Sequence, residues 1–258
     1  MVQFDLQGKR GLITGGCGPL GWALVNAFAD AGAEVVAADL PDAVTARSDA
    51  MREGVVGVPC NLMENDAVDS LCSEVRDNHG RLDFLVNNAA FTGDSTLGGY
   101  STSFLDQTDD AFDLALRLNL AVPFRLSRRL TPMLSESASG CILNVGSIYG
   151  LLGPVLSLYE GTGMGNSAAY AASKGGLIQL TRYLATVLAP DVRVNCLAPG
   201  GILRGQPSSF VERYEERTPL GRMASEEDVL GAAVWLVGDA AAYVTGQTIA
   251  IDGGWSAW

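Results

Sequence analysis

Lysine is scarce in this chain, which has two lysines, Lys9 and Lys174, against fifteen arginines. Histidine is scarcer still, since His79 is the single one. The five cysteines are scattered along the sequence and odd in number, and none forms a C-x-x-C pair. These shortages argue against a zinc site and a disulfide framework, so we expect buried free thiols and no metal.

Long apolar runs are also missing, because no stretch of about 18 residues lacks a charged, glycine or polar break, and no membrane span is predicted. The first residues have neither the basic region nor the apolar region of a signal peptide, which favours a cytoplasmic location. Positive charge is in deficit as well. The net charge of −12 disfavours nucleic acid and anionic lipid as partners, because both reward basic patches.

Short apolar runs alternate along the chain with longer segments of helical pattern. Seven runs are predicted strands, at 11–14, 34–39, 55–58, 82–87, 141–145, 192–197 and 248–251. Helical patterns occupy about 19–31, 64–79, 109–136, 167–189 and 225–237. Continuous apolar strands are typical of a parallel sheet covered on both faces. The alternation therefore predicts an α/β fold with a doubly wound parallel sheet, and nothing resembling a linker divides it into two domains.

Two segments stand outside this alternation. One is the glycine-rich segment 150–167, and the other is about 200–222, which contains both glycine and proline. Each follows the end of a predicted strand. Because ligands of open parallel sheets bind beyond the carboxyl ends of the strands, both segments are candidate walls or lids of a site.

A glycine-rich turn joins the first predicted strand to the first predicted helix. Gly16, Gly18 and Gly21 form the pattern G-x-G-x-x-G, and Pro19 suits a first helical position. Glycines let backbone amides approach a pyrophosphate, and the helix N-terminus favours its negative charge. The pattern predicts a dinucleotide site, with a tight turn that binds nothing as the alternative.

Asp39 ends the second predicted strand, 18 residues after Gly21. A carboxylate there can accept hydrogen bonds from both adenosine ribose hydroxyls of NAD, and it would repel the 2′-phosphate of NADP. Neither 16–18 nor 40–41 offers an arginine or lysine to hold that phosphate. NAD is therefore favoured over NADP, and a helix cap or a solvated strand end is the alternative role of this carboxylate.

Tyr170 and Lys174 are four residues apart in the predicted helix 167–189, which has Ser167 as its candidate N-cap. This spacing places both side chains on one helix face. A nearby ammonium favours the phenolate, and lowering a tyrosine pKa by about three units needs about 4 kcal/mol, which one close charge in a partly dry site can supply. The pair is a candidate acid–base catalyst, and a surface cation lying beside a ring is the alternative.

The motifs together occur in the order and spacing of one family. They are Thr14-Gly15 to Gly21, Asn87-Asn88-Ala89, Asn119, Ser147, Tyr170-x-x-x-Lys174 and Pro199-Gly200. The chain resembles the classical short-chain dehydrogenase/reductases over essentially its whole length. This resemblance implies a single domain, 1–258, with a Rossmann-type seven-stranded sheet, hydride transfer between a carbinol or carbonyl and a nicotinamide, and usually a tetramer. The cofactor-binding half would be about 1–140, and the catalytic and substrate half about 141–258.

The resemblance also implies roles for single residues. Tyr170 would be the acid–base residue, and Lys174 would bind the nicotinamide ribose and lower the tyrosine pKa. Ser147 would stabilise charge on the substrate oxygen, and Asn119 would hold a helix bend and a water that passes protons to solvent. A turn cap and a core amide are the plainer alternatives for these last two. The implied cofactor contacts are Gly15, Cys17, Pro19, Leu20, Gly21, Asp39, Leu40, Asn61, Leu62, Asn88, Ala89, Ala90, Tyr170, Lys174, Pro199, Gly200 and Ile202.

Some positions depart from the family pattern, although none removes a catalytic group. Pro19 and Ala90 stand where the family usually has glycine. Asn61 replaces the usual aspartate, and Arg204 replaces a threonine that is often found there. Arg204 could hold a phosphate or carboxylate of the substrate, or it could form a surface salt bridge.

The interval between Ser147 and Tyr170 is longer than the family usually has. Its extra residues include Tyr159, which lacks a partner lysine because Gly163 stands four positions later. The inserted segment 150–167 and the C-terminal segment are similar to those of dehydrogenases from bacterial nonulosonic-acid and flagellin-glycan pathways, which act on amino sugars or their phosphates. Trp255 and Trp258 are expected at a subunit interface.

The sequence therefore predicts an NAD-dependent oxidoreductase that interconverts a secondary alcohol and a ketone. The expected substrate is a sugar or amino-sugar derivative, and a 3-oxoacyl thioester or a small ketone is the alternative. A non-catalytic NAD-binding sensor is the alternative from another class of protein. The expected partners are a small-molecule alcohol or ketone and further copies of the chain in a homotetramer or homodimer.

Overall fold

Seven parallel strands form one sheet in the order β3-β2-β1-β4-β5-β6-β7. The computed structural model describes residues 4–92 and 97–258. The strands are β1 (Arg10–Thr14), β2 (Glu34–Asp39), β3 (Val55–Pro59), β4 (Phe84–Asn87), β5 (Gly140–Val145), β6 (Val192–Pro199) and β7 (Thr248–Ile251). All seven predicted strands are confirmed, and so is the single-domain α/β fold with a Rossmann-type doubly wound sheet.

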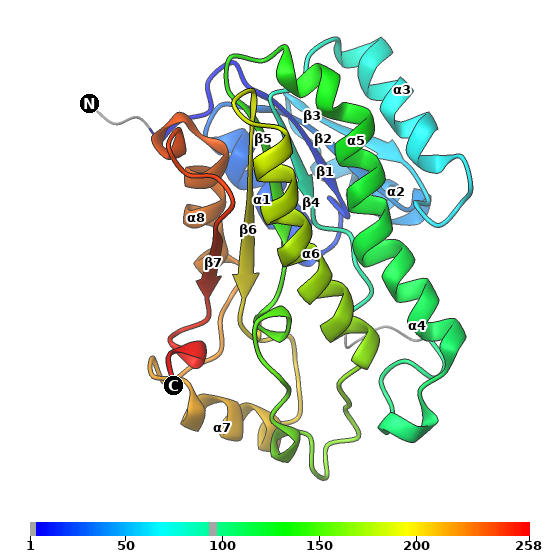
Figure 1. The fold of residues 1–258 in the computed structure, drawn as a ribbon, viewed down its shortest axis with the longest axis vertical. Helices are drawn as coiled ribbons and strands as arrows, with labels where there is room; N and C mark the ends of the chain where they lie inside the picture. The colour runs from blue at the N-terminus through cyan, green and yellow to red at the C-terminus, as the bar shows by residue number, and fades with distance from the viewer. Residues whose placement is uncertain (1–3, 93–96) are drawn as a thin grey trace.

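Helices cover both faces of this sheet (Figure 1). They are α1 (Pro19–Asp30), α2 (Pro41–Arg47), α3 (Ala67–His79), α4 (Asp109–Leu116), α5 (Val122–Ser135), α6 (Ala168–Val187), α7 (Ser208–Arg217) and α8 (Glu227–Val237). Helices α1 and α8 pack on one face, and α3, α5 and α6 pack on the other. Within the described residues, no helix combines the length and the apolar character needed to cross a membrane.

Neighbouring residues of each strand belong to different cores, which explains the continuous apolar runs. Leu12 packs in the core beneath α3, α5 and α6, whereas Ile13 packs in the core beneath α1 and α8. Leu85 and Val86 divide in the same way. Since successive strand side chains point to opposite faces, a sheet covered on both faces requires an apolar residue at every position.

Three helical features differ from the expected pattern. Helix α2 was not predicted, because seven residues with one buried side chain, Val44, give almost no periodic signal. The predicted helix 109–136 is divided by a π-helical turn at Arg117–Ala121. The segment 200–222, for which no helix is predicted, contains α7, whose buried residues are Phe210 and Tyr214.

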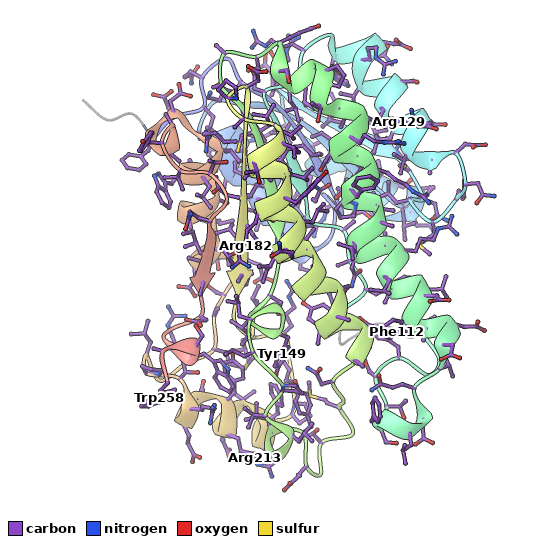
Figure 2. All side chains as sticks on the ribbon, in the orientation of Figure 1. Phe112, Arg129, Tyr149, Arg182, Arg213 and Trp258 are labelled. Carbon is purple, nitrogen blue, oxygen red and sulfur yellow. The ribbon has the colours of Figure 1, made fainter. Side chains whose placement is uncertain are left out.

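The inserted segment 150–167, α7 and the C-terminal turn Trp255–Ala257 pack together beyond the carboxyl ends of β6 and β7 (Figures 1 and 2). Trp255 is buried within the chain and stacks on Tyr214, with ring centroids 4.2 Å apart, so its expected place at a subunit interface is wrong. Its side chain is instead part of the core that supports α7. Trp258 is exposed at the same end of the molecule.

Candidate active site

A cleft of about 800 Å³ lies at the carboxyl ends of the strands. The strand order reverses between β1 and β4, and this reversal is where open parallel sheets leave room for a ligand. The glycine-rich turn and the ends of β2, β4, β5 and β6 line one part of the cleft. Helix α6, the inserted segment and α7 line the rest, so both candidate walls predicted from the sequence border the site.

At Gly15 and Gly21 the glycine-rich turn leaves no room or conformational freedom for a side chain. Gly15 has a φ of +62°, and a Cβ on Gly21 would lie 1.8 Å from the carbonyl oxygen of Gly15. Helix α1 begins at Pro19, and Gly18 before it offers no side-chain cap. The N–H groups of the first helical turn are therefore not capped by a side chain, and they lie at the end of the helix that borders the cleft. Such a turn fits the pyrophosphate of a dinucleotide.

The Asp39 carboxylate is already fixed to this turn. Its Oδ2 accepts hydrogen bonds from the N–H groups of Cys17 at 2.9 Å and Gly18 at 3.2 Å, and its Oδ1 accepts one from the N–H of Leu40 at 2.8 Å. An ionised carboxylate offers about four lone-pair directions, two on each oxygen, so Oδ1 retains one acceptor direction after these three bonds. Asp39 therefore lines the cleft as an oriented acceptor, and its remaining Oδ1 direction fits a ribose hydroxyl.

The ends of β1 and β4 are tied together beneath the cleft. The Thr14 hydroxyl accepts hydrogen bonds from the N–H groups of Asn88 at 3.1 Å and Ala89 at 3.2 Å. The Asn88 side chain donates in return to the carbonyls of Thr14 and Gly15, both at 3.0 Å. This reciprocal arrangement holds the glycine-rich turn against the floor of the cleft.

Lys174 projects from the middle of α6 and is 3% exposed. Its Nζ donates a hydrogen bond to the carbonyl of Val145 at 2.7 Å and lies 5.7 Å from the centroid of the Tyr170 ring. Burial lowers the pKa of the Lys174 ammonium to about 8. The lysine is therefore protonated at neutral pH and close to the tyrosine, as an acid–base pair requires.

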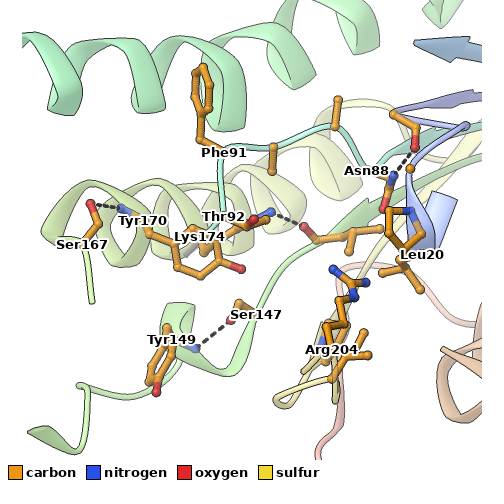
Figure 3. Close-up of a pocket in the computed structure, with 18 of the residues that line it drawn as sticks. Leu20, Asn88, Phe91, Thr92, Ser147, Tyr149, Ser167, Tyr170, Lys174 and Arg204 are labelled. Atoms are coloured by element: carbon orange, nitrogen blue, oxygen red, sulfur yellow. Dashed lines mark hydrogen bonds between the residues drawn. The ribbon is translucent and has the colours of Figure 1, made fainter. Parts of the chain in front are cut away.

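Ser147 and Tyr170 are directed into the same part of the cleft (Figure 3). Ser147 follows β5, and its Oγ accepts a hydrogen bond from the N–H of Tyr149 at 3.2 Å. Tyr170 is held in the first turn of α6, where the Ser167 side chain accepts from its N–H at 3.4 Å, so Ser167 is the N-cap as predicted. Because the Ser147 hydroxyl accepts that backbone bond, its own proton is directed elsewhere and suits a substrate oxygen.

Asn119 lies behind the cleft in the π-helical turn between α4 and α5. Its Oδ1 accepts from the N–H of Phe91 at 2.8 Å, and its Nδ2 donates to the Phe91 carbonyl at 3.1 Å and the Ser173 hydroxyl at 3.1 Å. The amide thus joins the segment after β4 to α6. The expected helix bend is present, and the expected role in proton transfer stays a prediction.

Almost all predicted site residues line this cleft, and those that do are Gly15, Pro19, Leu20, Gly21, Asp39, Leu40, Asn61, Leu62, Asn88, Ala89, Ala90, Ser147, Tyr170, Lys174, Pro199, Gly200 and Ile202. Cys17 does not belong to the lining, because its side chain packs in the core under α1 and only its backbone N–H reaches Asp39. Asn119 is likewise buried away from the lining.

Several side chains of the cleft have no counterpart among the predicted residues. They are Tyr149, Tyr159, Asn166, Gln206, Phe210 and Tyr214. Tyr214 anchors the loop after β6, because its hydroxyl accepts from the N–H of Gly201 at 2.6 Å. Contacts between the inserted segment and α7 hold Tyr159, Phe210 and Tyr214 at the cleft, and the sequence carries no local signal for such contacts.

Arg204 lines the cleft and also forms the expected salt bridge, with its Nε 2.9 Å from Glu226 Oε1. Figure 3 shows its side chain extending into the cleft. Arg204 can form this salt bridge and still bind a phosphate or carboxylate of the substrate, since the guanidinium has further donors beyond Nε.

Comparison with known proteins places this geometry in a family. A family model described as Enoyl-(Acyl carrier protein) reductase matches residues 18–256. The 3-oxoacyl-[acyl-carrier-protein] reductase FabG of Thermotoga maritima is 33% identical, over 96% of this chain and 98% of that protein. Nodulation protein G of Rhizobium meliloti is 32% identical, over 97% of this chain and 98% of that protein.

Two solved structures are similar over almost the entire chain. The short chain dehydrogenase of Leptospira borgpetersenii with bound NAD+ has a TM-score of 0.86 and 32% identity, covering 99% of this chain and 97% of that one. A putative NAD(P) dependent gluconate 5-dehydrogenase of Beutenbergia cavernae, with bound NADP, has a TM-score of 0.87 and 31% identity, covering 100% of both. The chain belongs to the classical short-chain dehydrogenase/reductase family and is an oxidoreductase of the class that acts on CH–OH groups with a nicotinamide cofactor.

Proposed function

We propose that this chain interconverts a secondary alcohol and a ketone with NAD(H), using Tyr170 as the acid–base group. The observation that carries the proposal is the buried Lys174 amine beside the Tyr170 ring, with Ser147 directed into the same space. The cation favours the phenolate, and the phenolate can accept the proton of a bound alcohol.

The residues divide the chemistry between them. The nicotinamide, when bound, supplies the hydride acceptor or donor. In oxidation, Tyr170 accepts the hydroxyl proton, while the Ser147 hydroxyl donates to the same substrate oxygen and holds it in place. In reduction, Tyr170 returns the proton, and Ser147 stabilises the negative charge that develops on the carbonyl oxygen. Lys174 remains protonated throughout and stabilises the phenolate.

NAD is the proposed cofactor because of Asp39. The glycine-rich turn at Gly15 to Gly21 would hold the pyrophosphate, Asp39 the adenosine ribose and Lys174 the nicotinamide ribose. A 2′-phosphate would meet the Asp39 carboxylate at close range, and like charges in a partly dry site repel strongly. The nearby Arg47 is engaged elsewhere, since it donates to the Cys17 carbonyl and lies over the Trp22 ring.

The proposed substrate is a polar carbohydrate derivative. Hydroxyl and amide groups of Tyr149, Tyr159, Asn166 and Gln206 border the cleft, which favours a substrate with several oxygens. The gluconate 5-dehydrogenase likeness points the same way. The similarity to 3-oxoacyl-[acyl-carrier-protein] reductases favours a second candidate, reduction of a 3-oxoacyl thioester.

The test is Tyr170→Phe, with the exposed Tyr183→Phe as a matched control on the same helix. Loss of a positioned acid–base group typically costs about 10² to 10⁴ in rate. We therefore expect NADH formation from the best alcohol to fall by at least about a hundredfold in the Tyr170 variant, while NAD binding measured by calorimetry changes little.

A panel of sugars, sugar phosphates, small alcohols and 3-hydroxyacyl esters, each with NAD and with NADP, identifies the substrate class. Near-normal turnover by the Tyr170 variant would exclude the mechanism. Tight NAD binding with no turnover of any alcohol by the wild type would favour a sensor instead of an enzyme. Higher activity with NADP than with NAD would overturn the role proposed for Asp39.

A further inference from the structure

Two tyrosines that line the cleft near the proposed catalytic residues share a hydrogen bond. Tyr149 follows β5, and Tyr159 belongs to the inserted segment 150–167. Their hydroxyl oxygens are 2.6 Å apart, and Nδ2 of Asn166 donates to the Tyr159 hydroxyl at 3.3 Å. All three residues line the cleft.

The number of protons in this pair leaves one donor unused. Two phenols carry two protons, and one of these forms the bond between the hydroxyl oxygens. Asn166 adds a third proton and accepts none through Nδ2. Whichever tyrosine donates to the other, one phenolic O–H has no acceptor among the described residues. Both rings are partly buried, and a partly desolvated donor without an acceptor is unfavourable, so a ligand oxygen at this point would be stabilised.

Burial keeps the Tyr149 phenol protonated. It raises the pKa of Tyr149 well above the usual value, and the adjacent Tyr159 raises it further. Tyr149 is therefore a neutral hydrogen-bond donor, in contrast to Tyr170, whose neighbouring cation favours the phenolate. Tyr149 and Tyr170 thus present different chemistry to one cleft.

The pair is placed beyond the reacting carbon. The backbone N–H of Tyr149 donates to the Ser147 hydroxyl, so the two residues are adjacent in the cleft. Figure 3 shows the Tyr149 hydroxyl directed away from Tyr170. A substrate whose reacting oxygen lies between Ser147 and Tyr170 would therefore meet the pair with a different atom.

The pair is also held in place by contacts of the inserted segment with α7. The Tyr159 ring packs against Phe210 of α7, with ring centroids 5.4 Å apart. On the outer side, Nη1 of Arg213 donates to the carbonyls of Ser157, Leu158 and Glu160 at 3.1, 3.3 and 2.7 Å. A donor fixed in this way can discriminate between substrates, because little ordering is needed when one binds.

We propose that the Tyr149–Tyr159 pair donates a hydrogen bond to a second oxygen of the substrate, borne by a carbon other than the one oxidised. This inference rests on the proposed function and names its substrate class, which is a polyol or hydroxy ketone. The inserted segment then determines specificity, because it supplies Tyr159 and Asn166.

The experiment compares cyclohexanol with 1,2-, 1,3- and 1,4-cyclohexanediols as substrates, with NAD and in initial-rate assays. The variants are Tyr149→Phe, Tyr159→Phe and the double variant, with Tyr183→Phe as control. Phenylalanine preserves the ring packing and removes only the hydroxyls. We expect wild type to favour one diol over cyclohexanol in kcat/KM, and the double variant to lose about tenfold in that ratio. Of the single variants, the one that removes the donating hydroxyl should account for most of the loss.

Cyclohexanol is the internal control, because its kcat/KM should be nearly equal in all variants if the fold and the catalytic group are intact. Equal losses for the diol and cyclohexanol in the double variant would overturn the proposal, and so would an unchanged ratio. Either result leaves the proposed function standing, because alcohol oxidation is still observed. Absence of NADH formation by wild type from every alcohol would instead reject the proposed function and this inference together.

Discussion

Burial gives Lys174 an acid–base behaviour unlike that of a surface lysine. In the folded chain its pKa is lowered to about 8 from the ordinary 10.5, because desolvation disfavours the ammonium. A lowered lysine pKa means that charging the group destabilises the fold. Its contribution to stability is therefore most favourable above about pH 10.5 and is lost as the pH falls through 8. At neutral pH the amine is still charged, and this charge is what the phenolate of Tyr170 needs.

The variant Lys174→Met isolates this effect. We expect the free energy of unfolding of wild type, relative to that of the variant, to rise by about 3 kcal/mol between pH 7 and pH 10.5, at about 1.36 kcal/mol per pKa unit. The comparison cancels the tyrosine and cysteine titrations that both proteins share. Urea unfolding without cofactor at several pH values measures the difference. A difference that does not vary with pH would show that Lys174 is solvated in the folded chain.

Residue spacing predicts the part of the site that local structure builds. Tyr170 and Lys174 share a helix face wherever the helix forms, and Asp39 reaches the glycine-rich turn because β1 and β2 are neighbours. The Tyr149–Tyr159 pair had no such signal. Its two hydroxyls meet through the path of the inserted segment, which depends on Phe210 and on hydrogen bonds to backbone carbonyls.

At the scale of elements, one arginine connects the inserted segment to α7. Arg213 donates to three carbonyls of that segment, and α7 in turn packs on Trp255 through Tyr214. The segment 150–167, α7 and the C-terminal turn form one wall because of these contacts. A wall attached at few points can open locally at a free-energy cost far below that of global unfolding.

Arg213→Ala should loosen this wall without unfolding the protein. We expect amide hydrogen exchange of 155–162 to rise by about tenfold, since each lost hydrogen bond to a carbonyl contributes about 0.5–1.5 kcal/mol net. Arg217→Ala is the matched control. Arg217 is on the same helix as Arg213 and lies over the Trp255 ring, but among the described residues it forms no hydrogen bond with the inserted segment. Hydrogen exchange with mass spectrometry separates the two variants. Equal exchange in both would mean that apolar packing alone holds the segment.

The elements themselves were predictable where periodicity is strong. Seven strands and the long helices have continuous or amphipathic apolar patterns, because each packs on the sheet core. Helices α2 and α7 escaped prediction, since each buries one or two side chains and derives its stability from tertiary contacts. The π-helical turn at Asn119 was predictable only as a bend, because the bonds that accompany it reach Phe91, far along the chain.

At the scale of the whole molecule, the net charge of −12 disfavours association between copies of the chain, whereas exposed apolar side chains favour it. Copies of the chain repel at long range, so stable association requires apolar contact. Large apolar side chains are exposed on α4, α5 and α6, at Phe112, Phe124, Tyr183 and Val187. These helices lie on one side of the sheet (Figure 1), and α4 packs against α6. This helical layer is a candidate face for the homotetramer or homodimer expected from the family.

Phe124→Glu tests this face. A carboxylate placed in an apolar contact between two copies leaves a charge desolvated and unpaired, which costs several kcal/mol per contact. We expect the variant to have a smaller mass than wild type by light scattering at equal concentration, with the difference reduced as salt is raised. Val56→Glu, on the edge strand β3, is the control, because Val56 is comparably exposed at a site remote from α6. A monomeric wild type, or an unchanged mass in the Phe124 variant, would show that this layer does not join the copies, because an interface there could not accept a buried carboxylate.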